Sequence, residues 1–284
     1  MMKDMRAMGA RIALSASLAL AGGCAAGTAG VTPNVWESGR TIEYATTSGQ
    51  TMTMEIPGMG AMTTGISQTV ELTLAAASAP REFQMKVRTV EVRMDVPDPS
   101  MDTGEMDQYK ALEGLEATFT VAEDGLVATA SGLDENRGVQ AMGGVEGFKE
   151  QMLQSFFLPL PESGEISQGV RWTRESRIPV VQSGMEMEIS SATEYLVEEQ
   201  TEYGGFPVWK IAVNSEDQMA GGGDQMGMPM DMAAAGRTEG TLYVELGTNA
   251  LVYAESTAFL SGDITAPGMS IDIDINVTSS VERR

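Results

Sequence analysis

The sequence predicts a mainly β protein in which two antiparallel meanders form a curved half-barrel or barrel-like sheet. Three observations support this fold class. Apolar and polar residues alternate in many short segments, turn residues separate these segments, and only one segment has helical spacing. A two-sheet β-sandwich is the alternative, because a twisted sheet of about ten strands tends to curl or to split into packed layers.

Composition excludes several classes of function. Of the 284 residues, 18 are Lys or Arg and 40 are Asp or Glu, which gives a net charge of −22. We expect no nucleic-acid binding, because affinity for phosphate depends on clustered basic side chains. The chain has no histidine, which removes imidazole-based hydrolysis and the usual His-ligated metal sites. The apolar fraction of 42% is enough for a folded core.

The strands of the first half follow from alternation of apolar and polar residues. They are predicted at residues 51–56, 70–74, 83–87, 90–96, 115–121 and 126–130. The apolar positions are odd-numbered up to Val87 and even-numbered from Val90, so we predict a β-bulge or bend near Arg88-Thr89. Glu123-Asp124-Gly125 predicts a hairpin turn.

One segment departs from this pattern, at residues 145–157, where apolar residues recur every three or four positions. This spacing predicts an amphipathic helix, which Leu158-Pro159-Leu160-Pro161 ends. Strands are then predicted again at residues 170–173, 185–189, 195–197, 208–213, 242–246, 251–253 and 269–277.

The strands on either side of the helix are similar in sequence. Met52–Ile56 matches Met185–Ile189, and Thr118–Val121 matches Thr241–Val244 in the same order along the chain. We therefore predict an internal repeat, with units of about 36–144 and 165–284 joined by the helix within a single β-rich domain of residues 36–284.

The first 23 residues have the features of an export signal. A basic start is followed by an apolar run from Ile12 to Leu20, by small residues and by the only cysteine, Cys24. The apolar run is shorter than the ~20 residues that a membrane span needs. This order resembles a bacterial lipoprotein signal, with Ala21-Gly22-Gly23-Cys24 as its cleavage box. An ordinary secretory signal beside an incidental thiol is the alternative.

The resemblance implies that the signal is removed and that Cys24 receives lipid on its sulfur and on its new amino terminus. The residue after Cys24 is Ala25, whereas an Asp at this position favours retention at the inner membrane. The resemblance therefore implies an anchor in the outer membrane facing the periplasm. Residues 24–35 are then expected to form a flexible tether, and the membrane is the first expected partner.

Two further features carry a resemblance over residues 36–282: the Leu158–Pro161 stop after the helix and the Gly169-x-x-Trp172 start of the second half. The chain resembles a family of bacterial lipoproteins with a duplicated β-rich domain. It is more distantly similar to the curved-sheet carriers of the periplasm, which ferry lipoproteins or glycolipids. Those carriers hold acyl chains between a concave sheet and internal helices.

Methionine is the candidate ligand-binding residue type, with 22 in the chain. Inward strand positions and the helix give a predicted apolar lining of Met52, Met54, Met185, Met187, Phe148 and Met152. Met is unbranched and polarisable, so such a lining can adapt to an acyl chain, although ordinary core packing is the alternative.

A second methionine group lies in a predicted Gly-rich loop at residues 218–236: Met226, Met228, Met230 and Met232. Thioethers are soft ligands that suit Cu(I), so weak copper binding is one interpretation of this loop. The other interpretation is a compositionally biased surface loop without a metal.

No enzyme and no cofactor are predicted. The chain has no Gly-x-Ser-x-Gly elbow, no Ser-x-x-Lys pair and no phosphate-binding Gly-rich loop with Lys. The favoured prediction is a membrane-anchored envelope lipoprotein that binds a lipid-like or other apolar ligand on a concave sheet. A structural or protein-interaction lipoprotein of the outer membrane, which binds envelope proteins, is the alternative.

Overall fold

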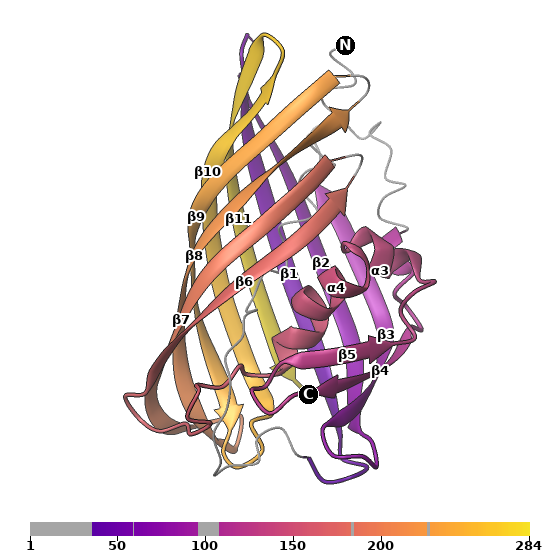
Figure 1. The fold of residues 1–284 in the computed structure, drawn as a ribbon, viewed down its shortest axis with the longest axis vertical. Coiled ribbons are helices and arrows are strands. Elements are labelled where there is room, and N and C mark those ends of the chain that lie inside the picture. The colour runs from indigo at the N-terminus through magenta and orange to yellow at the C-terminus, as the bar shows by residue number, and fades with distance from the viewer. Residues whose placement is uncertain (1–35, 59, 96–107, 183–184, 226–227) are drawn as a thin grey trace.

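A computed structural model describes residues 36–58, 60–95, 108–182, 185–225 and 228–284. In this part of the chain, eleven antiparallel strands form one curved, unclosed sheet in the order β5-β4-β3-β2-β1-β11-β10-β9-β8-β7-β6. A helical segment lies on its concave side, here called the inner face (Figure 1). The predicted curved sheet is confirmed, because the described strands form one sheet rather than a two-sheet sandwich.

The strands of the first half are β1 (Thr41–Ile56), β2 (Gly60–Ala76), β3 (Glu82–Asp95), β4 (Glu116–Val121) and β5 (Val127–Ser131). The helical segment consists of α3 (Arg137–Ala141), α4 (Gly144–Phe148), the π-helical turn η1 (Lys149–Leu153) and the 3₁₀ turn η2 (Gln154–Phe156). The second half contains β6 (Arg171–Gln182), β7 (Met185–Tyr203), β8 (Phe206–Gln225), β9 (Met228–Glu245), β10 (Leu251–Ala266) and β11 (Met269–Arg283).

The two meanders join in the middle of the sheet. β1 pairs with β11, from Tyr44 opposite Arg283 to Glu55 opposite Asp272. The chain runs outward from β1 to the edge strand β5, crosses the inner face as the helical segment, and returns inward from the other edge strand, β6. The predicted sequence repeat between the halves stays a prediction.

The predicted break in β3 is confirmed as a β-bulge. Thr89 lies opposite Glu71 and Val87 lies opposite Leu72, so Arg88 is the extra residue. Val87 and Val90 are both buried, whereas Arg88 and Thr89 are exposed. The bulge therefore keeps one face of β3 buried through the change from odd to even positions.

The predicted turn between β4 and β5 is also confirmed. Asp124 Oδ1 accepts a hydrogen bond from the backbone N–H of Leu126 at 3.1 Å, and Gly125 has a φ of +85°. A Cβ at Gly125 would lie 2.2 Å from the carbonyl oxygen of Leu158, so glycine is required both by the backbone angle and by the chain that passes over it.

The prediction of a loop at residues 218–236 is wrong, because its described residues belong to the hairpin of β8 and β9. Glycines on the inner face hide the alternation that would have revealed these strands. A Cβ at Gly221 would lie 2.2 Å from the Glu186 carbonyl oxygen, and one at Gly236 would lie 1.9 Å from that of Phe259. Glycine here allows neighbouring strands to approach closely where the sheet curls.

The predicted helix is present, but it is less regular and more deeply buried than the amphipathic pattern indicated. The helical turns of α4, η1 and η2 change from α to π to 3₁₀ within thirteen residues. The polar side chains of Gln151 and Gln154 are buried along with its apolar residues. Gln154 donates to the carbonyl of Gly125 and accepts from the N–H of Val127, both at 3.0 Å, which satisfies its amide inside the core.

An aromatic cluster fixes the end of the helical segment to the sheet. The ring centroid of Phe157 lies 4.9 Å from that of Phe83, 5.7 Å from Phe119 and 6.0 Å from Trp36. The ring of Phe156 lies 5.0 Å from Tyr44 on β1. The helical segment thereby packs on strands of the first meander, while α4 also contacts β6 of the second.

Candidate functional site

The inner face of the sheet carries a group of buried methionines at one end, here called the methionine end. Its members are Met52, Met54, Met187, Met219, Met230 and Met232, each at most 6% exposed. The strand register brings them together with isoleucines: Met54 lies opposite Ile273, Met52 opposite Ile275, and Met232 opposite Ile264. The result is an apolar lining rich in adaptable side chains.

A row of polar side chains crosses the inner face beside the methionine end. This polar row consists of Arg174, Thr193, Ser215, Asp217, Thr238, Ser256, Ser279, Ser48 and Gln68, on eight neighbouring strands from β6 to β2. On β1, β7, β8 and β9, the methionines lie on one side of the row. The residues that pack near the helical segment, such as Tyr44 and Tyr195, lie on the other side. The row therefore divides the apolar interior into two parts.

Asp217 is the carboxylate of the polar row and is 5% exposed. Its Oδ1 accepts a hydrogen bond from Ser215 Oγ at 2.7 Å, and its Oδ2 accepts one from Thr238 Oγ1 at 2.5 Å. Thr193 Oγ1 in turn donates to Ser215 Oγ at 3.1 Å. This hydrogen-bonded chain links β7, β8 and β9 and satisfies a charge that would otherwise be costly to bury.

At the β6 end of the row, Arg174 is 3% exposed and forms an ion pair with Glu150 of the helical segment, with 3.9 Å between Nη2 and Oε2. This pair joins the edge strand to the helical segment across the inner face.

The polar row was not predicted from the sequence, because hydroxyl, amide and charged side chains at inward positions look like a solvated face. The alternation along the strand is the signal that could have found them. Ser215 and Asp217 occupy odd-numbered positions of β8, as the buried Val213 and Met219 do.

The predicted lining residues divide between these two parts of the interior. Met52, Met54 and Met187 belong to the methionine end, whereas Phe148 and Met152 lie fully buried in the helical segment. The Cα of Met185 lies at the start of β7, and its side chain lies outside the described residues. The predicted lining is therefore not one continuous surface, and its sheet part is extended by methionines that were assigned to a loop.

The four methionines of the copper interpretation are placed only in part. Met230 and Met232 are each 2% exposed on β9, so they do not sit on a surface loop. Met226 and the side chain of Met228 lie outside the described residues. In the part that the structure describes, no group of three or more His, Cys, Asp or Glu side chains is arranged to hold a metal ion.

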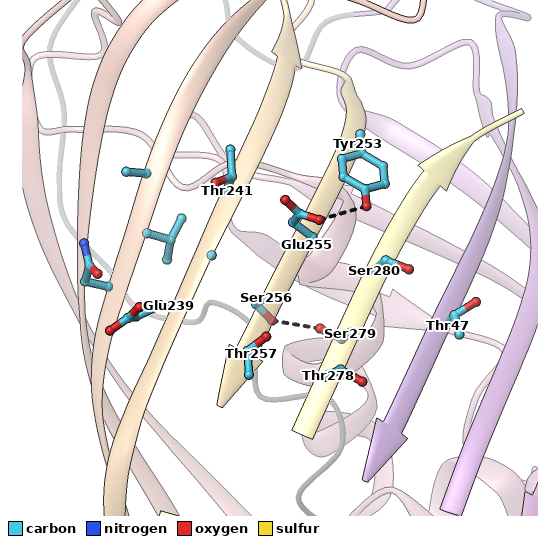
Figure 2. A pocket seen from close by; sticks show the side chains of 14 residues that line it. Thr47, Glu239, Thr241, Tyr253, Glu255, Ser256, Thr257, Thr278, Ser279 and Ser280 are labelled. Carbon is cyan, nitrogen blue, oxygen red and sulfur yellow. Dashed lines mark hydrogen bonds between the residues drawn. The ribbon is translucent and has the colours of Figure 1, made fainter. Parts of the chain in front are cut away.

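The outer face of the sheet carries a shallow groove of about 580 Å³ over β8 to β11 and β1 (Figure 2). Its side chains are mainly hydroxyls, with Asn214, Glu239 and Glu255. Tyr253 donates a hydrogen bond to Glu255 Oε2 at 3.1 Å in this groove, whereas Ser256 and Ser279, which bond to each other at 2.9 Å, belong to the polar row. None of the described residues that line this groove is a lysine or an arginine, so its chemistry does not favour an anionic ligand.

Three tyrosines, of which Tyr44 and Tyr195 are fully buried, give the folded state a pH-dependent stability. Burial raises the pKa of Tyr44 and of Tyr195 far above the usual value of 10, and burial, followed by the bond to Glu255, raises that of Tyr253 to about 12. The unfolded chain therefore loses these protons first as the pH rises, so stability is intact below pH 10 and declines above it.

We expect Tyr44→Phe to reduce the alkaline loss of unfolding free energy by up to about 1.4 kcal/mol per pH unit between pH 10 and 11. The hydroxyl of Tyr44, which donates to the Leu251 carbonyl at 2.9 Å, is then no longer available to ionise. Urea unfolding at a series of pH values measures this slope. If the variant loses unfolding free energy with pH as steeply as the unaltered protein, Tyr44 ionises alike in the folded and unfolded states.

No family model matches the sequence, and no curated protein matches it. Among solved structures, lipovitellin, from a study of its lipid–protein interactions, aligns at 10% identity with a TM-score of 0.48. That alignment covers 87% of this chain and 25% of the lipovitellin chain, so this chain spans about a quarter of its length. OccK9 of Pseudomonas aeruginosa aligns at 7% identity with a TM-score of 0.23, over 86% of this chain and 98% of OccK9.

The outer membrane protein OmpT of Vibrio cholerae aligns at 6% identity with a TM-score of 0.16, over 87% of this chain and all of that protein. These values are too low to transfer a function to this chain. No helix among the described residues is long and apolar enough to cross a bilayer.

Proposed function

We propose that this protein is a non-enzymatic lipoprotein of the cell envelope, anchored through Cys24, that binds a lipid-like or other apolar ligand on the inner face of its curved sheet. The observation that carries the proposal is the methionine end. An unclosed sheet presents six methionines on its inner face, on the side of the polar row away from the helical segment.

The position of the sheet edges supports a route for the ligand. β4 pairs with β3 only from Glu82 to Lys86, and the Val87 backbone bonds to Gly114 and Leu115. The described pairings therefore leave β3 beyond Val87 as an edge beside β2. Val92 and Met94 on this stretch are only partly buried, although both pack on the core. This partly covered edge, next to the methionine end, is where we expect an apolar chain to enter.

The adaptability of methionine supports the same proposal. A side chain with three rotatable bonds and no branching can repack around an inserted chain at lower cost than Ile or Val, whose χ1 is restricted. A core that only had to be stable would not require this property at six positions. The proposed ligand exchanges places with methionine side chains rather than filling a preformed void.

A fluorescent fatty acid, 11-(dansylamino)undecanoic acid, tests this proposal by titration. The protein used is the chain from Ala25 onward, which contains every described residue, exported behind a cleavable signal that has no cysteine. We expect an emission increase on binding, and a loss of affinity of at least about tenfold in Met54→Glu, because the charge must be desolvated. Thr53→Glu places the same charge on the opposite face of β1 and is expected to bind normally.

Circular dichroism establishes whether Met54→Glu is folded. If Met54→Glu does not fold, a second measurement uses the unaltered sequence. A fatty acid with a photoactivated diazirine on its chain should label residues of the methionine end. Labelling confined to the outer face, or saturable binding that Met54→Glu and Thr53→Glu reduce equally, would contradict the proposed site.

The outer membrane interaction protein remains the second candidate, and the groove of Figure 2 is the feature that favours it. Its hydroxyls both donate and accept hydrogen bonds, and its two glutamates accept them, so it suits a neutral or cationic polar surface. Substitution of Glu239 and Glu255 by Gln is expected to leave binding of the fatty acid probe unchanged.

A further inference from the structure

Two polar atoms on the inner face of β2 have no hydrogen-bond partner among the residues that the structure describes. They are Thr64 Oγ1 and Gln68 Nε2, and their residues are 1% and 8% exposed. Buried polar groups in folded proteins are nearly always paired, because an unpaired one keeps the full cost of its desolvation. Two such groups on one strand therefore call for a specific explanation.

Both groups lie where the polar row meets the methionine end. Gln68 lies opposite Ser48 of β1 and Val92 of β3, and Thr64 lies opposite Met52. Ile66, which is also buried, separates them on the same face. They are thus placed next to the part of β3 that forms a sheet edge, on the route proposed for an entering chain.

The three strands around these groups carry no charged inward side chain among their described residues. Every inward residue of β1, β2 and β3 that the structure describes is apolar, aromatic, hydroxyl or amide, as the burial pattern and sequence of each strand establish. Gln68 offers an N–H donor, and Thr64 offers a hydroxyl that donates or accepts. Neutral donors in an apolar setting suit a neutral acceptor, whereas a carboxylate would be buried here without a cation beside it.

From this placement we infer that the ligand of the inner face is an acyl chain bearing a neutral carbonyl, an ester or an amide, rather than a free fatty acid. The inference rests on the proposed function. The carbonyl oxygen accepts a hydrogen bond from Gln68 Nε2, a second oxygen of the head group bonds to Thr64 Oγ1, and the chain lies along the methionine end.

Displacement of the dansyl probe by a matched pair of lipids tests the inference. 1-Palmitoylglycerol and 1-O-hexadecylglycerol differ in the ester carbonyl, and we expect the ester to displace the probe at an about tenfold lower concentration, the effect of one hydrogen bond to a buried donor. N-Palmitoylethanolamine carries its carbonyl in an amide. The concentration at which it displaces the probe, compared with that of the ester, distinguishes an amide ligand from an ester ligand. Palmitate is expected to bind more weakly than the ester.

Substitutions test whether Gln68 causes the preference for the ester over the ether. In Gln68→Leu the ester and the ether should displace the probe within about twofold of each other, whereas Gln84→Leu, on the outer face of β3, should keep the tenfold difference. Thr64→Val and its outward neighbour Thr63→Val form a second matched pair. Without ligand, Thr64→Val should raise the Tm by a few degrees, because an unpaired buried hydroxyl is removed.

A spectroscopic readout needs no variant. The infrared carbonyl band of 1-palmitoylglycerol, labelled with ¹³C at the carbonyl, should shift to lower wavenumber on binding relative to its position in hexane. Equal affinity for ester and ether, tighter binding of palmitate, or an unshifted band would overturn the inference while leaving apolar binding intact. Failure of all four lipids and of the probe to bind would instead overturn the proposed function.

Discussion

Replacing Phe157 by Ala is expected to lower the free energy of unfolding by about 3–5 kcal/mol. Phe157 is 3% exposed, and its ring contacts Trp36, Phe83 and Phe119 at centroid distances of 4.9 to 6.0 Å. Its backbone also forms an isolated bridge to Ala250. The substitution removes a ring that packs on the first meander, leaves a cavity, and breaks aromatic pairs that each add about 0.5–1.5 kcal/mol beyond burial.

Urea unfolding monitored by circular dichroism measures this loss. Phe259→Ala provides the matched control, because Phe259 is 46% exposed on the outer face of β10 and its removal should cost less than about 1 kcal/mol. Equal losses in the two variants would mean that the aromatic cluster does not hold the helical segment against the sheet.

Replacing Cys24 by Ser is expected to abolish lipid attachment completely. The proposed anchor depends on this one thiol, since the chain has no other cysteine. Metabolic labelling with an alkyne analogue of palmitate should label the unaltered protein and leave Cys24→Ser unlabelled. Ala25→Asp is the control: it should keep the label but move the protein from the outer to the inner membrane. Persistent labelling of Cys24→Ser would refute lipidation at this residue.

The strands that the sequence reveals are those whose inward side chains are large and apolar. The parity change between Val87 and Val90 predicts the bulge at Arg88, because a bulge is the ordinary way for a strand to keep one face buried through such a change. Asp124-Gly125 predicts its turn because it provides both the side-chain acceptor and the positive φ.

The features that the sequence hides depend on neighbours far away along the chain. Gly221 and Gly236 look like loop residues until β7 and β10 are placed against them, since only then is the space for a Cβ seen to be occupied. Asp217 looks like a solvated acid until Ser215 and Thr238 are found within hydrogen-bond distance. Alternation identifies strands, but it does not give the register that brings these residues together.

The residues of the candidate site also divide into those that the sequence reveals and those that it hides. Met52, Met54 and Met187 are inward by alternation alone, whereas Met230 and Met232 are recognised as inward only in the folded hairpin. The change from α to π to 3₁₀ turns between Gly144 and Phe156 was also not predictable, because periodic spacing of apolar residues does not distinguish these helix types when the segment is buried on several sides.

Native mass spectrometry of the chain from Ala25 onward, exported in a bacterial host and purified without detergent, tests the central claim most directly. An apolar ligand on the inner face predicts a reproducible added mass in the range of a lipid, which fragmentation identifies as an acyl ester, an acyl amide or neither. A single ligand-free mass, unchanged after incubation with 1-palmitoylglycerol and with the dansyl fatty acid, would contradict the claim that the methionine end is a binding surface.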